Sequence, residues 1–497
     1  MGIPVYFKTI LKKYSNKIIY KGKLDKEINS LFLDLNCLIH PCCRGLTDEN
    51  EMIQKILHEI DKLIEYTSVT DLLYIAIDGI APKAKMKQQR MRRYNKYYEN
   101  KYSADKSWNT NNITPGTFFM NALNDSLKIY SESSKLNIIL SDSSERGEGE
   151  HKILNYIRNN LNDNINDNLC IYGLDADLIQ LSLVSRINNI YLLREKTEYN
   201  IENTNEEYIY LNIDLLKKYI LDELHLNRIL NQDQIIDDTI FLCMMFGNDF
   251  INHISSINLR YNGYEYIFDT YKSLQDRYQG YFCLIDRKLK NYLHLSFFTE
   301  FIQELSKNED KYMNNIFNIR KKQLNKITNL YKNNYIDFKT LINDLNIDEK
   351  NITIDDIYHI KSKLNSDKFI DNLPLLYSMN EKKIYENTKY DKNICSDYLD
   401  SLLWCIHYYF DKCIHWRWCT EYNTAPTCKY LNKYLSTIDS LEIKQYNQEF
   451  THKEQLSFIF PNDSHNLHKY KIKSKEYILK PKLSFNRYLW ECHLDFV

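Results

Sequence analysis

Acidic residues recur in this sequence where a predicted buried segment ends. Six of them follow short apolar segments typical of buried strands, and the seventh follows an apolar helix. They are Asp34, Asp78, Glu148, Glu150, Asp175, Asp177 and Asp249. The carboxyl ends of parallel strands line one crevice, so these side chains should converge. Seven carboxylates in one crevice would repel one another unless divalent cations bridged them.

Such a cluster suits a particular chemistry. Two Mg²⁺ ions about 4 Å apart, held by hard oxygen ligands, can clamp the attacking and leaving oxygens of a phosphodiester. Mn²⁺ can substitute for Mg²⁺ in a site of this type. The alternative, that these positions are unrelated surface acids, is disfavoured because nearly all of them end a predicted strand.

A basic segment follows the second acid of the group. After Asp78, Gly79 and Pro82 interrupt the strand, and a helix is expected from Lys83 onward. Spacings of three and four residues then bring four hydrogen-bond donors to one face of that helix. They are Lys85, Gln89, Arg92 and Arg93. Guanidinium forks and an ammonium suit a terminal phosphate, although this stretch alone leaves open an ordinary solvated basic helix.

Three aromatic side chains could stack on unpaired bases. His40 follows the strand that ends at Asp34, whereas Trp416 and Trp418 lie in an aromatic and basic cluster near residue 417. Stacking of a base on an aromatic side chain contributes about 1–3 kcal/mol. From the residues alone, plain core packing of the tryptophans and a structural histidine at a helix start stay open as alternatives.

The elements that would position these residues alternate between strand and helix. Strands are predicted from Leu31 and at residues 72–77, 138–141, 169–172 and 190–194. Helices are predicted at residues 50–69, 118–127, from Ile153, at 236–249 and at 398–409. Glu148 and Glu150 should lie in an extended turn before Ile153 and point the same way. The alternation predicts an α/β fold around a parallel sheet.

Bulk properties limit the classes of protein that remain. The 497 residues have a net charge of −1, so any nucleic-acid contact must use a local basic surface. The 12 cysteines contain no CxxC pair, which favours free thiols in a reducing compartment over a zinc ribbon or disulfide framework. Neither a signal peptide nor a transmembrane segment is evident, so we expect a soluble intracellular protein without membrane contact. The scarce Gly and abundant Tyr, Asn, Ile and Lys suggest an AT-rich genome, as in some large DNA viruses or protists.

The motifs resemble those of the Xrn family of processive 5′→3′ exoribonucleases, in order along nearly the whole chain. In the first half, the matching segments are Met1-Gly-Ile-Pro4, Asp34-Leu-Asn36, Ile39-His-Pro41, Asp78-Gly-Ile-Ala-Pro82, Gln88-Gln-Arg90, Thr114-Pro-Gly-Thr117, Gly147-Glu-Gly-Glu-His-Lys152, Tyr172-Gly-Leu-Asp-Ala-Asp-Leu178, Leu192-Leu-Arg-Glu195 and Gly247-Asn-Asp-Phe250. In the second half they are Leu403-Trp-Cys-Ile-His-Tyr-Tyr409, Trp416-Arg-Trp418 and Trp490-Glu491. Two segments depart from the family pattern: Ile251-Asn-His253 replaces Leu-Pro-His, and Cys419-Thr-Glu421 replaces Tyr-Tyr-Pro.

The resemblance implies a function and a role for each site. It implies hydrolysis of single-stranded, 5′-monophosphorylated RNA to 5′-mononucleotides by a two-metal mechanism, as in RNA degradation and mRNA decay. The seven acids would bind two Mg²⁺ ions. The donor group of Lys85, Gln89, Arg92 and Arg93 would bind the 5′-phosphate. His40 would stack on the first base opposite a tryptophan, with Trp418 favoured over Trp416.

The resemblance also implies an architecture. The catalytic core at residues 1–295 would be a parallel-sheet nuclease core like that of PIN domains and flap endonucleases, with helical insertions. Residues 296–372 would form a charged helical linker or insertion, and 373–497 a mostly helical second conserved region packed on the core. We expect a short form without the further C-terminal domains of larger members, and a monomer. It would act in the cytoplasm, or else in the nucleus.

Two other classes of function are alternatives to a 5′→3′ exoribonuclease. A flap endonuclease acting on DNA shares the acid cluster but carries a Gly-rich helix–two-turn–helix after the last acid. The segment Ile251-Asn-His-Ile-Ser-Ser-Ile-Asn258 has no such glycines. A catalytically inactive RNA-binding scaffold would be expected to have lost acids, and here all seven are present.

Overall fold

The structure is a computed structural model that describes residues 6–102, 108–161, 167–196, 206–224, 232–331, 381–446 and 448–462. It also describes residues 343, 346, 464, 467, 469, 472, 479–481 and 494–496. The motifs at Met1-Gly-Ile-Pro4 and Trp490-Glu491 lie outside the described residues. So does most of the expected linker beyond residue 331.

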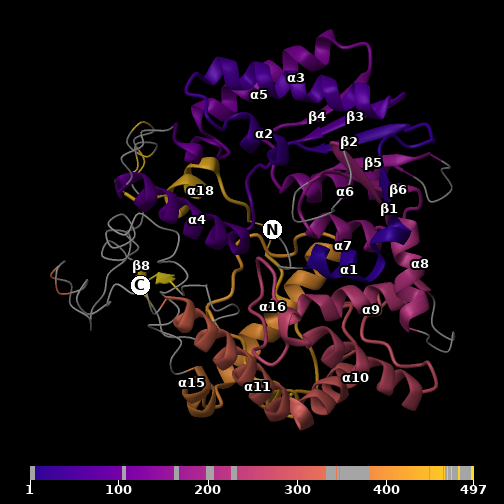
Figure 1. Cartoon of the computed structure of the whole chain (residues 1–497), viewed down its shortest axis with the longest axis vertical. Helices are drawn as coiled ribbons and strands as arrows, with labels where there is room; N and C mark the ends of the chain where they lie inside the picture. The colour runs from indigo at the N-terminus through magenta and orange to yellow at the C-terminus, as the bar shows by residue number, and fades with distance from the viewer. Residues whose placement is uncertain are drawn as a thin grey trace.

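A seven-stranded sheet forms the centre of the first half of the chain, in the order β1-β7-β6-β5-β2-β3-β4 (Figure 1). Its strands are β1 Ile19–Lys21, β2 Ser30–Asp34, β3 Leu72–Ala76, β4 Asn137–Ser141, β5 Leu169–Tyr172, β6 Ile190–Glu195 and β7 Tyr208–Asn212. The strands from β6 to β4 run parallel, whereas β7 is antiparallel to β6 and β1 is antiparallel to β7. The α/β fold with a mainly parallel sheet is therefore confirmed, and the antiparallel edge is a feature that the sequence did not reveal.

The register of the central strands brings three acids to one edge of the sheet. Asp34 at the end of β2 lies opposite Ala76 of β3, and Leu33 lies opposite Tyr172 of β5. The chain reaches Asp78 two residues after Ala76 and Asp175 three residues after Tyr172. Adjacent parallel strands thus deliver these acids to the crevice at their carboxyl ends.

Helices cover both faces of the sheet, because alternate strand residues point to opposite sides. Leu31 and Leu33 of β2 pack into one apolar cluster, and Phe32 packs into the other. The first cluster is completed by α2 Asn36–Cys42, α3 Glu49–Thr67 and α5 Phe118–Ser133. The second is completed by α1 Tyr6–Ile18, α6 Gly149–Asn160, α7 Asp177–Val184 and α8 Ile213–Leu224.

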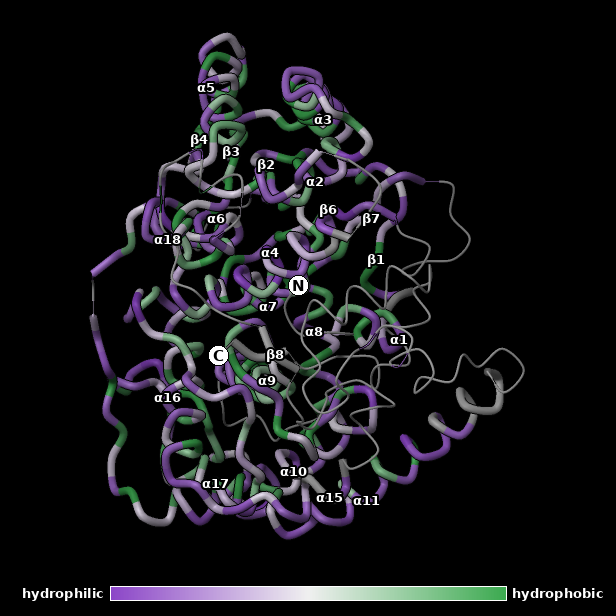
Figure 2. Tube along the Cα trace, turned by 90° about the vertical axis from the view of Figure 1, so that its left-hand side faces the viewer, coloured by the Kyte–Doolittle hydropathy of each residue, from purple (hydrophilic) through white to green (hydrophobic). Residues whose placement is uncertain are grey.

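The second half of the chain is mostly helical and shares the second of these clusters. The same apolar core continues into α9 Gln232–Met244, α10 Gly263–Arg277, α11 Leu295–Tyr331, α16 Lys392–Phe410 and α17 Cys428–Leu435. In the view of Figure 2, α3 and α5 lie at one end of the molecule and α10, α11 and α17 at the other, with the sheet between them. The helical second region thus packs on the sheet-bearing core through a continuous apolar interior.

The remaining elements are one long basic helix and several short segments. The long helix, α4 Lys83–Tyr102, packs on α18 His452–Ile459 through a small apolar cluster that includes Met86 and Ile459. The short elements are η1 Thr110–Asn112, η2 Leu259–Tyr261, α15 Glu381–Asn387, and the hairpin strands β8 Leu479–Pro481 and β9 Leu494–Phe496. Helix α4 begins at Lys83 as predicted.

Two helix boundaries differ from the prediction in ways that affect the site. Helix α6 begins at Gly149 rather than Ile153, so Glu148 is its N-cap residue and Glu150 lies in its first turn rather than in an extended segment. Carboxylates are favoured there by the positive end of the helix dipole. Helix α9 ends at Met244, and Gly247 follows with a φ of +79°. The Asn248 side chain accepts hydrogen bonds from the amides of Phe250 and Ile251, so Asp249 lies in a turn beyond the helix.

Candidate active site

Three of the predicted acids end or follow a strand, and the other four lie at the starts of α6 and α7 or after α9. Four of the seven are buried. Asp34, Glu148, Glu150 and Asp177 are buried, with Asp177 only 1% exposed. Asp78, Asp175 and Asp249 are half-buried. Burial of so many carboxylates is costly unless cations or hydrogen-bond donors compensate them.

Two glycines of the acidic loops lie close to Asp34. A Cβ atom on Gly149 would lie 2.6 Å from Oδ1 of Asp34, and one on Gly173 would lie 3.5 Å from its Cβ. Any larger residue at Gly149 would therefore push the start of α6 away from Asp34. The loop that carries Glu148 and Glu150 thus approaches the end of β2 because Gly149 lacks a side chain, whereas Gly173 leaves room mainly for Leu178, whose Cδ1 would clash with an added Cβ.

Asp78 is held between two neighbouring elements. Its Oδ2 accepts a hydrogen bond from Nδ2 of Asn36 at 2.9 Å, and its backbone amide donates to Oδ1 of the same asparagine at 3.0 Å. Its Oδ1 accepts from the backbone amide of Gly149 at 2.8 Å. Asp78 thus links the start of α2 to the start of α6, which carries Glu148 and Glu150.

Lys85 points into the acid cluster. Its Nζ lies 2.5 Å from Oε2 of Glu148 and 2.9 Å from Oδ2 of Asp249. Burial alone would raise the pKa of Asp249, but the Lys85 ammonium overcomes it and lowers that pKa to about 2. Helix α4 therefore reaches the acids through Lys85, two helical turns before Arg92.

The pKa values of other carboxyl groups in the cluster are raised because these groups are buried close together. Burial, with repulsion from Asp78 and Asp175, raises the pKa of Asp34 to about 8. Burial likewise raises the pKa of Asp177 to about 7 and, with repulsion from Glu148, holds the pKa of Glu150 well above its usual range. A bound cation would reverse these shifts, because it stabilises the ionised form of each group.

The acids fit a divalent cation, although they do not form a finished chelate. Oδ1 of Asp177 is buried and accepts no hydrogen bond from the described part of the chain, so this oxygen is suited to a cation. Among the described residues, no three acidic, histidine or cysteine side chains converge closely enough to hold a metal as they stand. Because Lys85 lies between Glu148 and Asp249, cations would have to draw the carboxylates together and displace its ammonium.

The predicted phosphate-binding residues share helix α4 but differ in their surroundings. Nε and Nη2 of Arg92, and Oε1 of Gln89, are buried and have no hydrogen-bond partner among the residues that the structure describes. Arg93 instead donates from Nε to Oγ1 of Thr114 at 3.0 Å and from Nη2 to the carbonyl of Ile113 at 3.0 Å. Burial and repulsion from Arg92 lower the pKa of Arg93 to about 10. The unpaired donors of Arg92 fit an anion, and Arg93 is oriented by the loop that contains Thr114.

His40 lies in the last turn of α2, and its side chain is partly exposed to solvent. The surrounding protein removes much of its hydration, and Arg93 and Arg92 repel a proton, so its pKa falls to about 4. The imidazole is therefore neutral at physiological pH, which suits an aromatic stacking surface.

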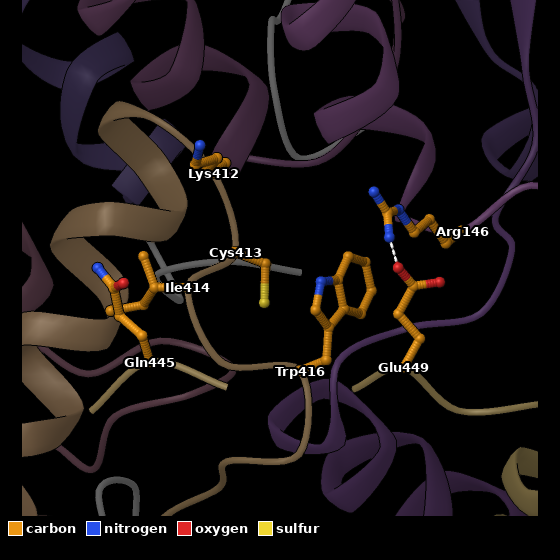
Figure 3. Close-up of a pocket in the computed structure, with 7 residues that line it drawn as sticks. All are labelled: Arg146, Lys412, Cys413, Ile414, Trp416, Gln445 and Glu449. Carbon is orange, nitrogen blue, oxygen red and sulfur yellow. Dashed lines mark ion pairs between the residues drawn. The ribbon is translucent and has the colours of Figure 1, made fainter. Parts of the chain in front are cut away.

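The two tryptophans have different environments. Trp418 stacks on Trp404 of α16 with ring centroids 5.2 Å apart, and it packs against the main apolar core. Trp416 lines a cavity of about 420 Å³, beside Cys413 and the Arg146–Glu449 ion pair (Figure 3). The Arg146 guanidinium lies 5.4 Å from the centre of the Trp416 ring. One face of Trp418 is thus occupied by protein, whereas Trp416 faces the cavity.

Two residues at the site had no functional role in the sequence analysis. The hydroxyl of Tyr408 donates to Oε1 of Glu148 at 2.8 Å, although 260 residues separate them. Nζ of Lys152 donates to the carbonyls of Ile77 and Asp142, which ties two strand ends to α6. Both residues lie in family-like motifs, but only the folded chain shows what they contact.

Comparison with known proteins identifies related chains. The model of the XRN 5′-3′ exonuclease N-terminus matches residues 1–196, and that of the Xrn1 helical domain matches residues 229–373 and 375–470. Human 5′-3′ exoribonuclease 1 is 27% identical over 539 residues, covering 94% of this chain and 31% of that protein. The 5′-3′ exoribonuclease 1 of Saccharomyces cerevisiae is 33% identical over 326 residues, covering 56% and 21%. This chain spans less than two fifths of the length of such relatives.

Solved structures of low overall similarity are also found. The catalytic core of Rad2 in complex with DNA substrate has a TM-score of 0.35 and 16% identity, covering 62% of this chain and 81% of that one. The bacteriophage T5 D15 flap endonuclease has a TM-score of 0.32 and 13% identity, covering 58% of this chain and 87% of that one.

Within the described residues, none of the helices has the length and apolar character needed to cross a bilayer.

Proposed function

This chain belongs to the Xrn family of 5′-3′ exonucleases, and on that premise we propose that it degrades RNA from the 5′ end. Its substrate would be single-stranded RNA with a 5′-monophosphate, and its products 5′-mononucleotides. The observation that carries the proposal is the arrangement of helix α4. Lys85 joins the acid cluster, and Arg92, two turns along the same helix, holds buried and unpaired donors.

The acid cluster would hold the divalent cations of the reaction. We assign Asp34, Asp78, Glu148, Glu150, Asp175, Asp177 and Asp249 to two Mg²⁺ ions, with Mn²⁺ as a substitute. When bound, such ions generate a nucleophilic hydroxide and neutralise charge on the scissile phosphate. Asp78 supports this role because Asn36 and the Gly149 amide already fix its orientation.

Helix α4 would anchor the end of the substrate. Arg92 offers buried donors without partners among the described residues, and Arg93 adds a second guanidinium. Gln89 would donate from its amide nitrogen, and Lys85 lies between this group and the acids. A 5′-hydroxyl RNA would leave the donors unpaired, and buried unpaired donors discriminate strongly between ligands. Anchoring the terminal phosphate also fixes the distance to the bond that is cut, so one nucleotide would leave per cycle.

Base stacking would restrict the substrate to unpaired strands. The neutral imidazole of His40 offers one face, and Trp418 or Trp416 would offer the other. The flap-endonuclease alternative is not favoured, because the matching family models are those of 5′-3′ exonucleases. The presence of all seven acids disfavours an inactive scaffold. We further propose a monomer that acts in RNA decay in the cytoplasm or the nucleus.

A single substitution tests the catalytic role of the acids. Asp177→Asn keeps the shape of the buried side chain and removes its charge, so hydrolysis of 5′-monophosphorylated RNA should fall at least 100-fold while RNA binding persists. The matched control is Asp61→Asn, since Asp61 is an exposed acid of α3 whose Oδ1 accepts a hydrogen bond from the Tyr130 hydroxyl. Near-normal hydrolysis by pure Asp177→Asn protein would overturn the assignment.

A further inference from the structure

Two adjacent tyrosines on α16 differ in whether their hydroxyl groups make a hydrogen bond. Tyr408 and Tyr409 are both buried, with exposed fractions of 3% and 0%. The Tyr408 hydroxyl donates to Oε1 of Glu148 at 2.8 Å. The Tyr409 hydroxyl is buried and has no hydrogen-bond partner among the described residues. The sequence therefore contains a matched pair in which one hydroxyl donates a hydrogen bond to the acid cluster, whereas the other lies near Asp177 without a hydrogen bond among the described residues.

The ring of Tyr408 is held on several sides. It stacks on His151 of α6 with ring centroids 3.7 Å apart, and on Trp404 of its own helix at 4.7 Å. Phe250, next to Asp249, meets it edge-on at 5.4 Å. The elements that carry Glu148, Glu150 and Asp249 thus all contact this one ring, so the hydroxyl has little freedom to move.

The two carboxylate oxygens of Glu148 are contacted by residues from two different parts of the chain. Lys85 contacts its Oε2, and Tyr408 donates to its Oε1, so each carboxylate oxygen has its own donor. The contact with Lys85 is shared with Asp249, and it would change when cations or a substrate phosphate bind near the ammonium. The contact with Tyr408 lies on the other oxygen and comes from a rigid apolar helix, so it can persist through that change.

We propose that Tyr408 is a positioning residue that fixes the carboxylate of Glu148, leaving Oε2 to serve the divalent cation. The inference rests on the proposed nuclease function and deepens it, because it gives the helical second region a direct part in building the metal site. Tyr408 acts only through Glu148 and contacts neither the substrate nor the reacting atoms. Hydrogen-bond partners of metal-ligating carboxylates typically contribute 10- to 100-fold to metal affinity or activity.

The test compares Tyr408→Phe with Tyr409→Phe in the full chain. Tyr408→Phe should lower kcat and weaken binding of Mn²⁺, titrated without RNA, each by about 10-fold or more, while KM for RNA stays within about twofold. Tyr409→Phe should change both quantities much less, because its hydroxyl, although near Asp177, makes no hydrogen bond within the described part of the chain. Equal Mn²⁺ affinity in the two variants would overturn the proposal.

A second measurement separates positioning from general damage to the fold. If Tyr408 acts through Glu148, the Tyr408→Phe change should not weaken Mn²⁺ binding further in a Glu148→Gln background. An equal loss in both backgrounds would mean that the tyrosine is only structural, and would refute the proposal. These binding titrations use no RNA, so a wild-type protein that fails to degrade RNA would defeat the proposed function without deciding this inference.

Discussion

Replacing Lys85 with methionine should destabilise the protein more than any comparable change at the surface. The Lys85 side chain is 8% exposed and lies 2.5 Å from Glu148 and 2.9 Å from Asp249. The two carboxylates keep the pKa of Lys85 well above its usual range despite its burial, so it is charged at every pH of interest. Methionine fills similar space but leaves the carboxylates without their cation.

The size of the effect follows from these distances. Each contact is worth on the order of 6 kcal/mol of gross Coulomb energy at an effective dielectric constant of about 20. Desolvation offsets much of this, and breaking a buried ion pair by removing one partner costs about 3–5 kcal/mol net. Unfolding entropy of about 2.1 cal/mol/K per residue over 497 residues gives a shift of roughly 1 °C per kcal/mol. The melting temperature should therefore fall by about 3–5 °C at pH 8.

The loss should depend on pH in a definite direction. Without Lys85, the pKa of Glu148, which burial already raises, should rise further. An acid whose folded pKa lies above its unfolded value of about 4.3 contributes stability that is lost as pH rises through the folded pKa. Because Lys85 also holds the pKa of Asp249 at about 2, the Asp249 part of the deficit is already present at pH 5, above the unfolded pKa of about 3.9. The deficit of Lys85→Met should therefore be measurable at pH 5 and grow further towards pH 8.

The assay is thermal unfolding at pH 5, 6.5 and 8 without divalent ions, repeated with Mg²⁺. Mg²⁺ should recover part of the loss at pH 8, because it supplies the missing positive charge. Lys62→Met is the matched control, since Lys62 also lies 2.6 Å from a carboxylate, that of Glu59, but is 47% exposed. An exposed pair contributes about 0–1 kcal/mol. A melting temperature for Lys85→Met equal to that of Lys62→Met at pH 8 would refute this reasoning.

Two further predictions concern His40 and Glu309. Because the pKa of His40 is about 4, its ionisation should leave kcat/KM unaffected between pH 5.5 and 8. His40→Phe should keep most activity and the same pH profile, whereas in His40→Ala the value of kcat/KM should fall roughly 5- to 100-fold. If kcat/KM titrated near pH 6.5 in the wild type and this titration disappeared in His40→Phe, the prediction would be contradicted. Glu309 of α11 accepts hydrogen bonds from the amides of Cys428 and Lys429 at the start of α17, 2.8 and 2.9 Å long. Glu309→Gln places an amide donor against one of these amides and should cost about 1–3 kcal/mol in thermal unfolding with kcat unchanged; unaltered stability would argue against this link.

The acids at strand ends could be predicted because their position depends on local pattern. Asp34, Asp78 and Asp175 follow short apolar segments, and any parallel sheet brings the ends of its strands together. Asp177 follows at the start of the next helix, where the chain turns back over the same edge.

The parts that could not be predicted depend on contacts between distant segments. The early start of α6 at Gly149 depends on its amide bonding to Asp78, 71 residues away. The contact of Lys85 with Asp249, and of Tyr408 with Glu148, joins segments 164 and 260 residues apart. Spacing on a helix indicates which residues share a face, but it does not reveal which of them will point into an acid cluster.

The most direct test of the central claim is degradation of RNAs that differ only at the 5′ end and carry a label at either end. With Mg²⁺, the 5′-monophosphorylated RNA should lose its 5′ label at once as a mononucleotide, while the 3′ label stays on progressively shorter fragments. The 5′-hydroxyl, triphosphate and capped RNAs should resist, and EDTA should stop the reaction. Release of the 3′ label first, internal fragments as the first products, or equal decay of monophosphorylated and capped RNA would contradict the account.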